Sequence, residues 1–236
     1  MPPIHIYEKH EQLFQAAAKA LHPTKRYSTL IRERQDHIRA LTGSSSYNLL
    51  HLRIEQDWFA LCKRWTNPAA GRNNCMNNTF NVGEQLLEYG FEQEVRKQAT
   101  GRRDGFGPFG YELTVASNAP LTLRLPSPQV PIVVITSFRH VAPKDLRKAL
   151  VSLELQQYTV VLGKDLVGKE LQRDESALVD YYLGRGVDQF IGNSVSTFTA
   201  MLMMERQWLK RESYSYNGGS IPLAKFIPFD PTKQPS

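Results

Sequence analysis

The feature of this sequence that most constrains its fold is an alternation between short apolar runs and longer amphipathic segments. The apolar runs are YNLLHLRI (47–54), PIVVITSF (131–138), YTVVLG (158–163) and VDQFIGN (187–193). Segments with helical spacing separate or follow them, over residues 80–98, 143–155, 174–184 and 196–211. Strands that alternate with helices form parallel sheets covered on both faces. The pattern therefore predicts an α/β fold, with a Rossmann-like, mostly parallel sheet flanked by helices.

The sequence also predicts how the domain is bounded. Residues 1–45 form a helical N-terminal segment ahead of the predicted Rossmann-like domain, residues 46–225. The helices expected in this segment cover residues 8–21 and 26–41. Inside the domain, residues 100–130 are rich in glycine and proline and predict a long surface loop, whose glycines either cradle a phosphate or only make the loop mobile. The tail, residues 226–236, is expected to be disordered.

Composition limits the kinds of function that this chain can have. With 41% hydrophobic residues among 236, the chain can bury a sizeable core. The net charge of +6 favours anionic partners, but aromatic residues are not interleaved with a concentrated basic stripe, so nucleic acid is not expected as a partner. No apolar run approaches the roughly 20 residues that span a bilayer. The opening MPPIHIYEKHEQ has neither a basic nor an apolar region typical of a targeting signal.

The first segment with chemical potential is HLRIEQDW, residues 51–58, at the end of the first predicted strand. Alternation puts Leu50, Leu52 and Ile54 on one face, which packs, and His51, Arg53 and Glu55 on the other face. An arginine at the carboxyl end of a parallel strand is well placed to hold a phosphate with two donors. In the alternative interpretation, Arg53 forms a local ion pair with Glu55 or Asp57, and His51 is a core histidine with satisfied hydrogen bonds.

The second segment is VDQFIGNSVSTFTAMLMMERQ, residues 187–207, in which a predicted strand stops at Asn193 and a helix begins. Three hydroxyl groups lie at this helix start, on Ser194, Ser196 and Thr197. Together with the N–H groups and the dipole of the helix start, they can bind an anion such as phosphate. The alternative is plain N-capping, which needs only one of these residues.

These two segments resemble the protein O-fucosyltransferases: HLRIEQDW is followed, in the right order, by VDYYLGRGVDQFIGNSVSTFTAMLMMER, with the strand and helix context of both motifs intact. The resemblance covers residues 45–225 and is weakest over residues 80–130. It implies the donor-binding, C-terminal half of a GT-B architecture. It also implies inverting transfer of fucose from GDP-fucose to a hydroxyl of a protein or glycan acceptor, in the lumen of the endoplasmic reticulum or Golgi.

The resemblance further implies roles for particular residues. His51 and Arg53 match a histidine and an arginine that contact the diphosphate of the donor, and the arginine is the catalytic one. Asp180 matches an aspartate that helps to recognise the nucleotide. The residues that match those holding the phosphates are Ser196, Thr197 and Phe198. Breaking the bond from the sugar to the diphosphate builds negative charge on the leaving phosphate, and Arg53 would stabilise that charge as it develops.

Two departures from the family leave a second function open. Nothing in residues 1–45 corresponds to the glycine-rich N-terminal domain of these enzymes, and Ser137 stands where the family commonly has an aspartate. Neither Glu55 nor Asp57 is assigned as a general base. The alternative function is therefore a catalytically silent nucleotide-sugar-binding module, or a fragment that lacks the acceptor domain.

The two cysteines, Cys62 and Cys75, follow the first motif closely. Members of the family have a disulfide bond in this region, so the resemblance implies a Cys62–Cys75 link, which would stabilise the fold by roughly 3 kcal/mol. Two reduced cysteines are the alternative in a reducing compartment. Two cysteines and scattered histidines make no cluster of ligands, so no metal is expected.

Overall fold

The structure is a computed structural model that describes residues 20–65, 130–166, 171–193, 196–216 and 223–225, together with Leu13, Ala16 and Phe80. For residues 63–65 and 223–225 it describes the backbone alone. In chain order, the described elements are α2 Lys25–Thr42, β1 Asn48–His51, α3 Gln56–Trp65, β2 Ile132–Ile135, η2 Phe138–His140, α6 Pro143–Leu155, β3 Val160–Leu162, η3 Gly163–Leu166, α7 Arg173–Gly186, β4 Gln189–Asn193, α8 Thr197–Trp208, β5 Glu212–Tyr216 and β6 Leu223–Lys225.

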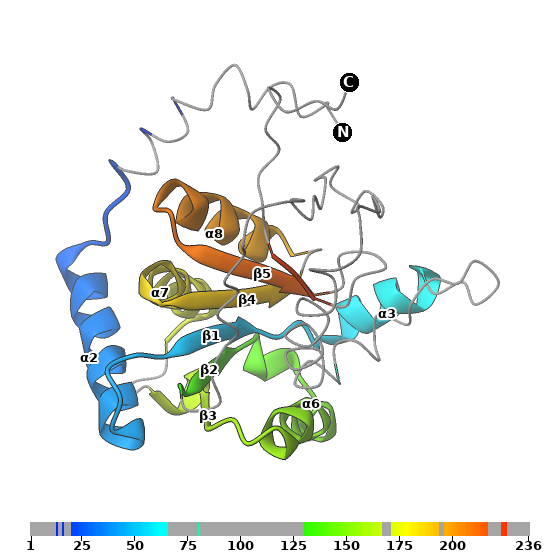
Figure 1. The fold of residues 1–236 in the computed structure, drawn as a ribbon. Coiled ribbons are helices and arrows are strands. Elements are labelled where there is room, and N and C mark those ends of the chain that lie inside the picture. Colours follow the sequence, from blue (N-terminus) through cyan, green and yellow to red (C-terminus); the bar gives the residue numbers. More distant parts are fainter. Residues whose placement is uncertain are drawn as a thin grey trace, which may run out of the picture.

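The strands form one sheet in the order β3-β2-β1-β4-β5-β6 (Figure 1). Strands β1 to β5 are parallel to their neighbours, and β6 is antiparallel to β5. Strand β1 lies in the interior of the sheet, with Leu49 opposite Val133 of β2 on one side and Phe190 of β4 on the other. The predicted α/β fold with a Rossmann-like, mostly parallel sheet is therefore confirmed.

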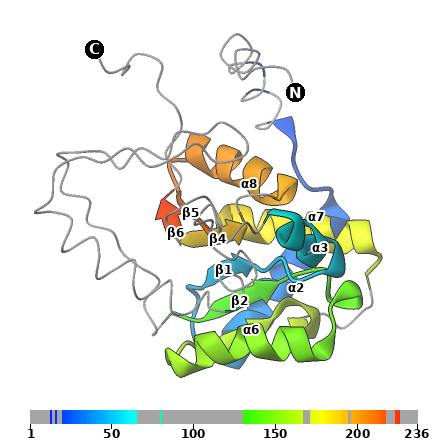
Figure 2. The same cartoon turned by 90° about the vertical axis from the view of Figure 1, so that its right-hand side faces the viewer.

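Helices cover both faces of the sheet because successive strand residues point in opposite directions. Leu50 lies on the first face, which packs against Leu153 of α6. Leu49 lies on the second face, which packs against α2, α7 and α8. Figure 2 shows α7 and α8 on one side of the strands and α6 on the other. Each fully buried leucine contributes about 1.5–3 kcal/mol. Among the helices of the described ranges, none is long and apolar enough to cross a membrane.

The order of the strands creates a switch point between β1 and β4. From β1 the chain adds β2 and β3 on one side, with α6 on the first face. It then crosses back by way of α7, on the second face, to β4 on the other side of β1, and continues through α8 to β5. Because open parallel sheets bind ligands where the strand order reverses, the ends of β1 and β4, at His51 and Asn193, are the expected binding position.

A buried arginine fixes α8 against the rest of the sheet. Arg206 is fully buried near the end of α8, and burial lowers its pKa to about 10, so it stays cationic at neutral pH. Its guanidinium donates hydrogen bonds to the carbonyl groups that end α7 and begin β5, namely those of Gly184, Val187, Asp188 and Glu212. The far end of α8, which faces the switch point, is therefore held in a defined position.

The predicted elements are found with shifted bounds. Strand β1 ends at His51, so Arg53 lies beyond the strand rather than inside the predicted run 47–54. Strand β5 was not predicted, because ESYSY has serines where a fully buried strand would have apolar residues. The predicted helix 80–98 lies outside the described residues except for residue 80, and the predicted loop 100–130 does so except for residue 130.

The described part of the chain includes one of the two cysteines. Cys62 of α3 is buried and disulfide-bonded. The only other cysteine of the sequence is Cys75, which lies outside the described residues. The bonded state of Cys62 is what the predicted Cys62–Cys75 link requires.

Candidate functional site

His51 joins the two candidate segments at the switch point. Its Nδ1 lies 2.9 Å from the hydroxyl oxygen of Thr199, in the first turn of α8. Its ring also packs on Phe198, with the ring centroids 4.8 Å apart. Burial, followed by the charge of Arg53, lowers the pKa of His51 to about 3, so its imidazole is neutral at physiological pH. The HLR motif (residues 51–53) and the STF motif (residues 196–198) therefore form one local structure, although His51 and Thr199 are 148 positions apart in the sequence.

Gly192 makes this contact possible. It lies in β4 directly opposite His51. A Cβ atom at this position would lie 2.4 Å from Cγ2 and 2.6 Å from Oγ1 of Thr199, distances that atoms in folded proteins do not tolerate. The absence of a side chain lets the first turn of α8 lie directly on the end of β4. Neither Gly192 nor Thr199 stood out in the sequence, since only the fold reveals how closely they approach.

The start of α8 supplies the donors that an anion would need. Ser196 is the buried N-cap residue, and its hydroxyl oxygen accepts a hydrogen bond from the N–H of Thr199 at 3.5 Å. Thr197 is exposed at the first helical position. The first N–H groups of a helix have no partner within it and carry its positive dipole end. Ser196 is therefore the cap, while the backbone after it and Thr197 face outward; Ser194 lies outside the described residues.

Arg53 follows β1, and its charge acts on the buried ring of His51. Its Nη2 lies 3.0 Å from Oδ2 of Asp57, and its guanidinium carbon lies 5.7 Å from the centroid of the Trp58 ring. The side chain is 25% exposed, and Asp57 is its one ion-pair partner among the described residues. The predicted local ion pair is thus present with Asp57. It uses one nitrogen of the guanidinium, so the others can still bind a phosphate.

Tyr216 holds the backbone of the HLR motif in place. Its hydroxyl donates a hydrogen bond to the carbonyl of His51, at 3.0 Å, and accepts one from the N–H of Arg53, at 2.9 Å. Burial raises the pKa of Tyr216, so this hydroxyl keeps its proton. A residue at the end of β5 therefore reaches across β4 to fix the segment that leaves β1. Sequence patterns do not reveal this role, because it depends on the strand order.

Asp180 has a different partner from the one that the sequence predicts. It lies on α7 and forms a buried ion pair with Arg34 of α2. Burial raises the pKa of Asp180 to about 6, and the guanidinium of Arg34 opposes the rise. This ion pair uses Oδ1 of Asp180. The recognition role of Asp180 stays a prediction, and the described contacts do not bring it to His51, Arg53 or Ser196.

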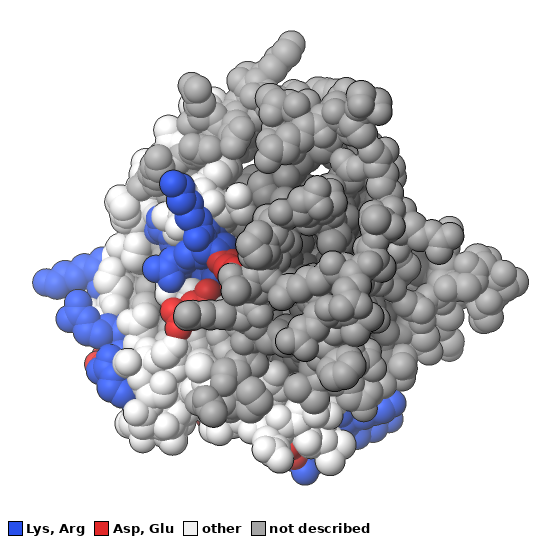
Figure 3. Space-filling model, viewed as in Figure 1, with Lys and Arg blue, Asp and Glu red and all other residues white. Residues whose placement is uncertain are grey.

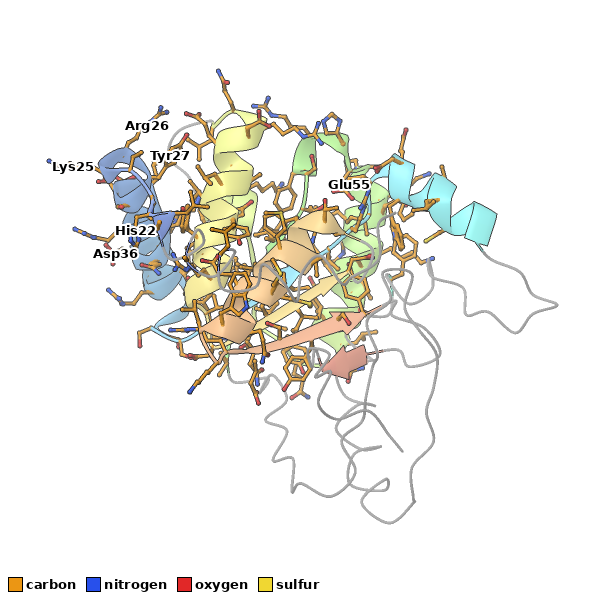
Figure 4. The ribbon with its side chains drawn as sticks, turned by 90° about the horizontal axis from the view of Figure 1, so that it is seen from above. His22, Lys25, Arg26, Tyr27, Asp36 and Glu55 are labelled. Atoms are coloured by element: carbon orange, nitrogen blue, oxygen red, sulfur yellow. The ribbon has the colours of Figure 1, made fainter. Side chains whose placement is uncertain are left out.

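Many of the basic side chains that the structure describes lie away from the switch point (Figure 3). In the view of Figure 3, basic side chains lie over α2 and near α7 and α8, whereas the carboxyl ends of β4 and β5 point toward α3 (Figure 1). Figure 4 shows Lys25 and Arg26 extending outward from α2, on the opposite side of the domain from Glu55. Among the described residues at the ends of β1 and β4, Arg53 and the start of α8 are therefore the groups that can attract an anion.

The buried, neutral state of His51 predicts how stability depends on pH. The folded pKa of His51 is about 3, below the ordinary value of 6.5, so the unfolded chain binds this proton more readily. Stability from this group is present above pH 6.5 and is lost as the pH falls toward 3, by about 2 kcal/mol at pH 5. His51→Gln should lack this loss. The free energy of unfolding is measured for wild type and for His51→Gln, each at pH 7 and at pH 5. If the two proteins differ by the same amount at both pH values, His51 is not a buried neutral imidazole.

The switch point thus combines a neutral imidazole and a helix start at the ends of β1 and β4 with a cation that follows β1. This combination can bind a diphosphate and stabilise negative charge that develops on it. Within the described ranges, no three His, Cys, Asp or Glu side chains come together as metal ligands would. The sequence matches no protein-family model and no curated protein.

Proposed function

We propose that this chain binds GDP-fucose at the switch point and transfers fucose, with inversion, to a hydroxyl of a protein or glycan acceptor. The observation that carries the proposal is the contact of His51 with Thr199 and Phe198. It joins the two sequence segments that resemble the protein O-fucosyltransferases, at the position where parallel sheets bind nucleotides. On this proposal the chain is similar to the donor-binding half of a GT-B enzyme.

Each group at the switch point has a definite task in this mechanism. Arg53 and the N–H groups at the start of α8 bind the diphosphate and stabilise the charge that it gains as the bond to the sugar breaks. If Nδ1 of neutral His51 accepts the proton of the Thr199 hydroxyl, the ring carries its own proton on Nε2. That N–H can donate to a phosphate oxygen without adding a positive charge. Tyr216 keeps Arg53 and His51 in register by holding their backbone.

A panel of nucleotides tests this function through thermal stability. A ligand at 100 times its Kd adds about 2.7 kcal/mol to the free energy of unfolding, which corresponds to an increase in Tm of roughly 5–10 °C for a chain of this size. We expect GDP and GDP-fucose to give such shifts, UDP to give a smaller shift, and free fucose to give none. Equal shifts with GDP and UDP would remove guanine selectivity from the proposal. No shift with any nucleotide would remove the nucleotide site itself.

A further inference from the structure

Glu55 has a carboxylate oxygen that receives no hydrogen bond from any described residue. The residue lies between the end of β1 and the start of α3 (Figure 4). One oxygen, Oε1, accepts hydrogen bonds from the hydroxyl of Thr136 and from the N–H of Ser137, both at 3.3 Å. The other, Oε2, is buried and has no hydrogen-bond partner among the described residues. The carboxylate is therefore held on the end of β2 by one oxygen, while the second has no donor.

Two candidates for a donor, Arg53 and Tyr216, form other interactions. The guanidinium of Arg53 forms its ion pair with Asp57 instead of Glu55. The hydroxyl proton of Tyr216 goes to the carbonyl of His51, although the charge of Glu55 is near enough to raise the pKa of Tyr216. A buried acceptor without a partner destabilises the folded state, and a charged one does so more strongly; this is a cost of folding. Such a cost in a folded protein calls for an explanation.

The position of Glu55 relative to the switch point explains why its second oxygen has no donor within the described protein. The start of α8 follows β4, on one side of β1, whereas Glu55 is bound to the end of β2, on the other side. Neighbouring strands lie about 4.8 Å apart, so these two positions are roughly 10 Å apart across the end of β1. A diphosphate at Arg53 and the start of α8 does not cover this distance. A nucleotide sugar is longer, and one of its two ends can reach Glu55.

We propose that Oε2 of Glu55 accepts a hydrogen bond from a hydroxyl or N–H group at one end of the nucleotide sugar, which makes Glu55 a specificity residue of the site. This inference rests on the proposed nucleotide-sugar function. It concerns recognition of the part of the ligand beyond the phosphates. The same donor chemistry is present in the sugar and in the nucleoside, and the choice of probes separates these two sources.

The test compares wild type with Glu55→Gln for inorganic pyrophosphate, GDP and GDP-fucose, by titration calorimetry. Glutamine keeps an acceptor for Ser137 and Thr136, and places an N–H₂ group where Oε2 was. We expect GDP-fucose to bind about 10- to 100-fold more weakly, as for a lost hydrogen bond to a charged group. Pyrophosphate should bind equally well or more tightly, because a negative charge has been removed. Weaker binding of GDP-fucose without weaker binding of pyrophosphate distinguishes recognition by Glu55 from a general effect of the changed charge.

The pattern of losses identifies the donor. Weaker binding of GDP-fucose alone assigns it to the sugar, and weaker binding of GDP as well assigns it to the nucleoside. Glu33→Gln makes the same chemical change on the exposed surface of α2 and should change none of the three affinities. The Tm of Glu55→Gln should not fall below that of wild type. Glu55→Asp keeps the negative charge but has a shorter side chain, and it should also bind GDP-fucose more weakly.

Two results would overturn the inference, and they are distinguishable from each other. If wild type binds GDP-fucose and Glu55→Gln binds it with the same or greater affinity, Glu55 does not recognise the ligand, while the proposed function stands. If wild type binds none of the three probes, the proposed function fails and the role of Glu55 fails with it.

Discussion

Replacement of Arg53 by alanine is expected to slow the release of GDP from GDP-fucose by about 10²- to 10³-fold, as when one preorganised donor for developing charge is lost. The guanidinium is partly exposed at the switch point and is paired with Asp57 through only one of its nitrogens. On this proposal, its remaining donors bind the leaving diphosphate. Binding of GDP should weaken at the same time, since the guanidinium also contacts the ground state.

The fold should survive this replacement. The partner carboxylate, Asp57, is 69% exposed, and such surface ion pairs contribute about 0–1 kcal/mol. Stacking of the guanidinium near Trp58 adds about 0.5–1 kcal/mol. The expected loss of stability is therefore about 1 kcal/mol, small beside the expected loss of rate. Measurement of Tm together with GDP release separates the two effects.

Arg39 provides a matched control for Arg53. It forms an ion pair with Asp36 at the same distance, 3.0 Å, but it lies on α2, away from the switch point. Arg39→Ala should leave GDP release unchanged. Arg53→Lys should restore it only in part, because an ammonium group cannot bind two oxygens in a fixed geometry. If Arg53→Ala keeps more than a tenth of the rate, or unfolds the protein, Arg53 does not have the proposed role.

Replacement of Gly192 by alanine should disrupt both the stability of the domain and the site. The new Cβ would overlap Thr199, a short side chain on a helix that Arg206 holds in place. We expect the free energy of unfolding to fall by about 1–3 kcal/mol, which is typical of overpacking. The first turn of α8 must also move, so the hydrogen bond between Thr199 and His51 should break and the stabilisation by GDP should be lost.

Gly186 and a double variant serve as controls for this prediction. Gly186 ends α7, and a Cβ at this position would meet nothing within 4 Å. Gly186→Ala should therefore keep or raise stability, by about 0.4–1 kcal/mol. The double variant Gly192→Ala with Thr199→Ala should regain part of the stability but not the affinity for GDP. Full stability in Gly192→Ala alone would contradict the close contact.

The sequence predicts the sheet and the residues at its carboxyl edge because both depend on local patterns. Four apolar runs alternate with helices, and HLR and STF each lie at an element boundary. The helix start at Ser196 is readable for the same reason, since an N-cap is a property of a few neighbouring residues. The confirmed α/β fold therefore needed no knowledge of distant contacts.

The side-chain contacts around the candidate site could not be predicted from the sequence, because they depend on how the strands and helices are arranged. Tyr216 holds the HLR backbone only because β5 lies beside β4, and β4 beside β1. Asp180 is on the predicted helix, but its ion pair with Arg34 follows from the packing of α7 against α2. Glu55 likewise bonds to Thr136 and not to Arg53, which its neighbours in the sequence do not indicate. Each of these contacts joins segments that are remote in the chain.

A crystal structure of the protein with GDP tests the central claim most directly, namely that HLR and the start of α8 form one diphosphate site. The predicted result places the phosphates between the guanidinium of Arg53 and the first N–H groups of α8, within about 3 Å of both. A different surface also offers arginines to an anion: the depression lined by Tyr182, Arg185 and Arg211 at the opposite edge of the sheet. Electron density for GDP in that depression, with the ends of β1 and β4 empty, would contradict the claim.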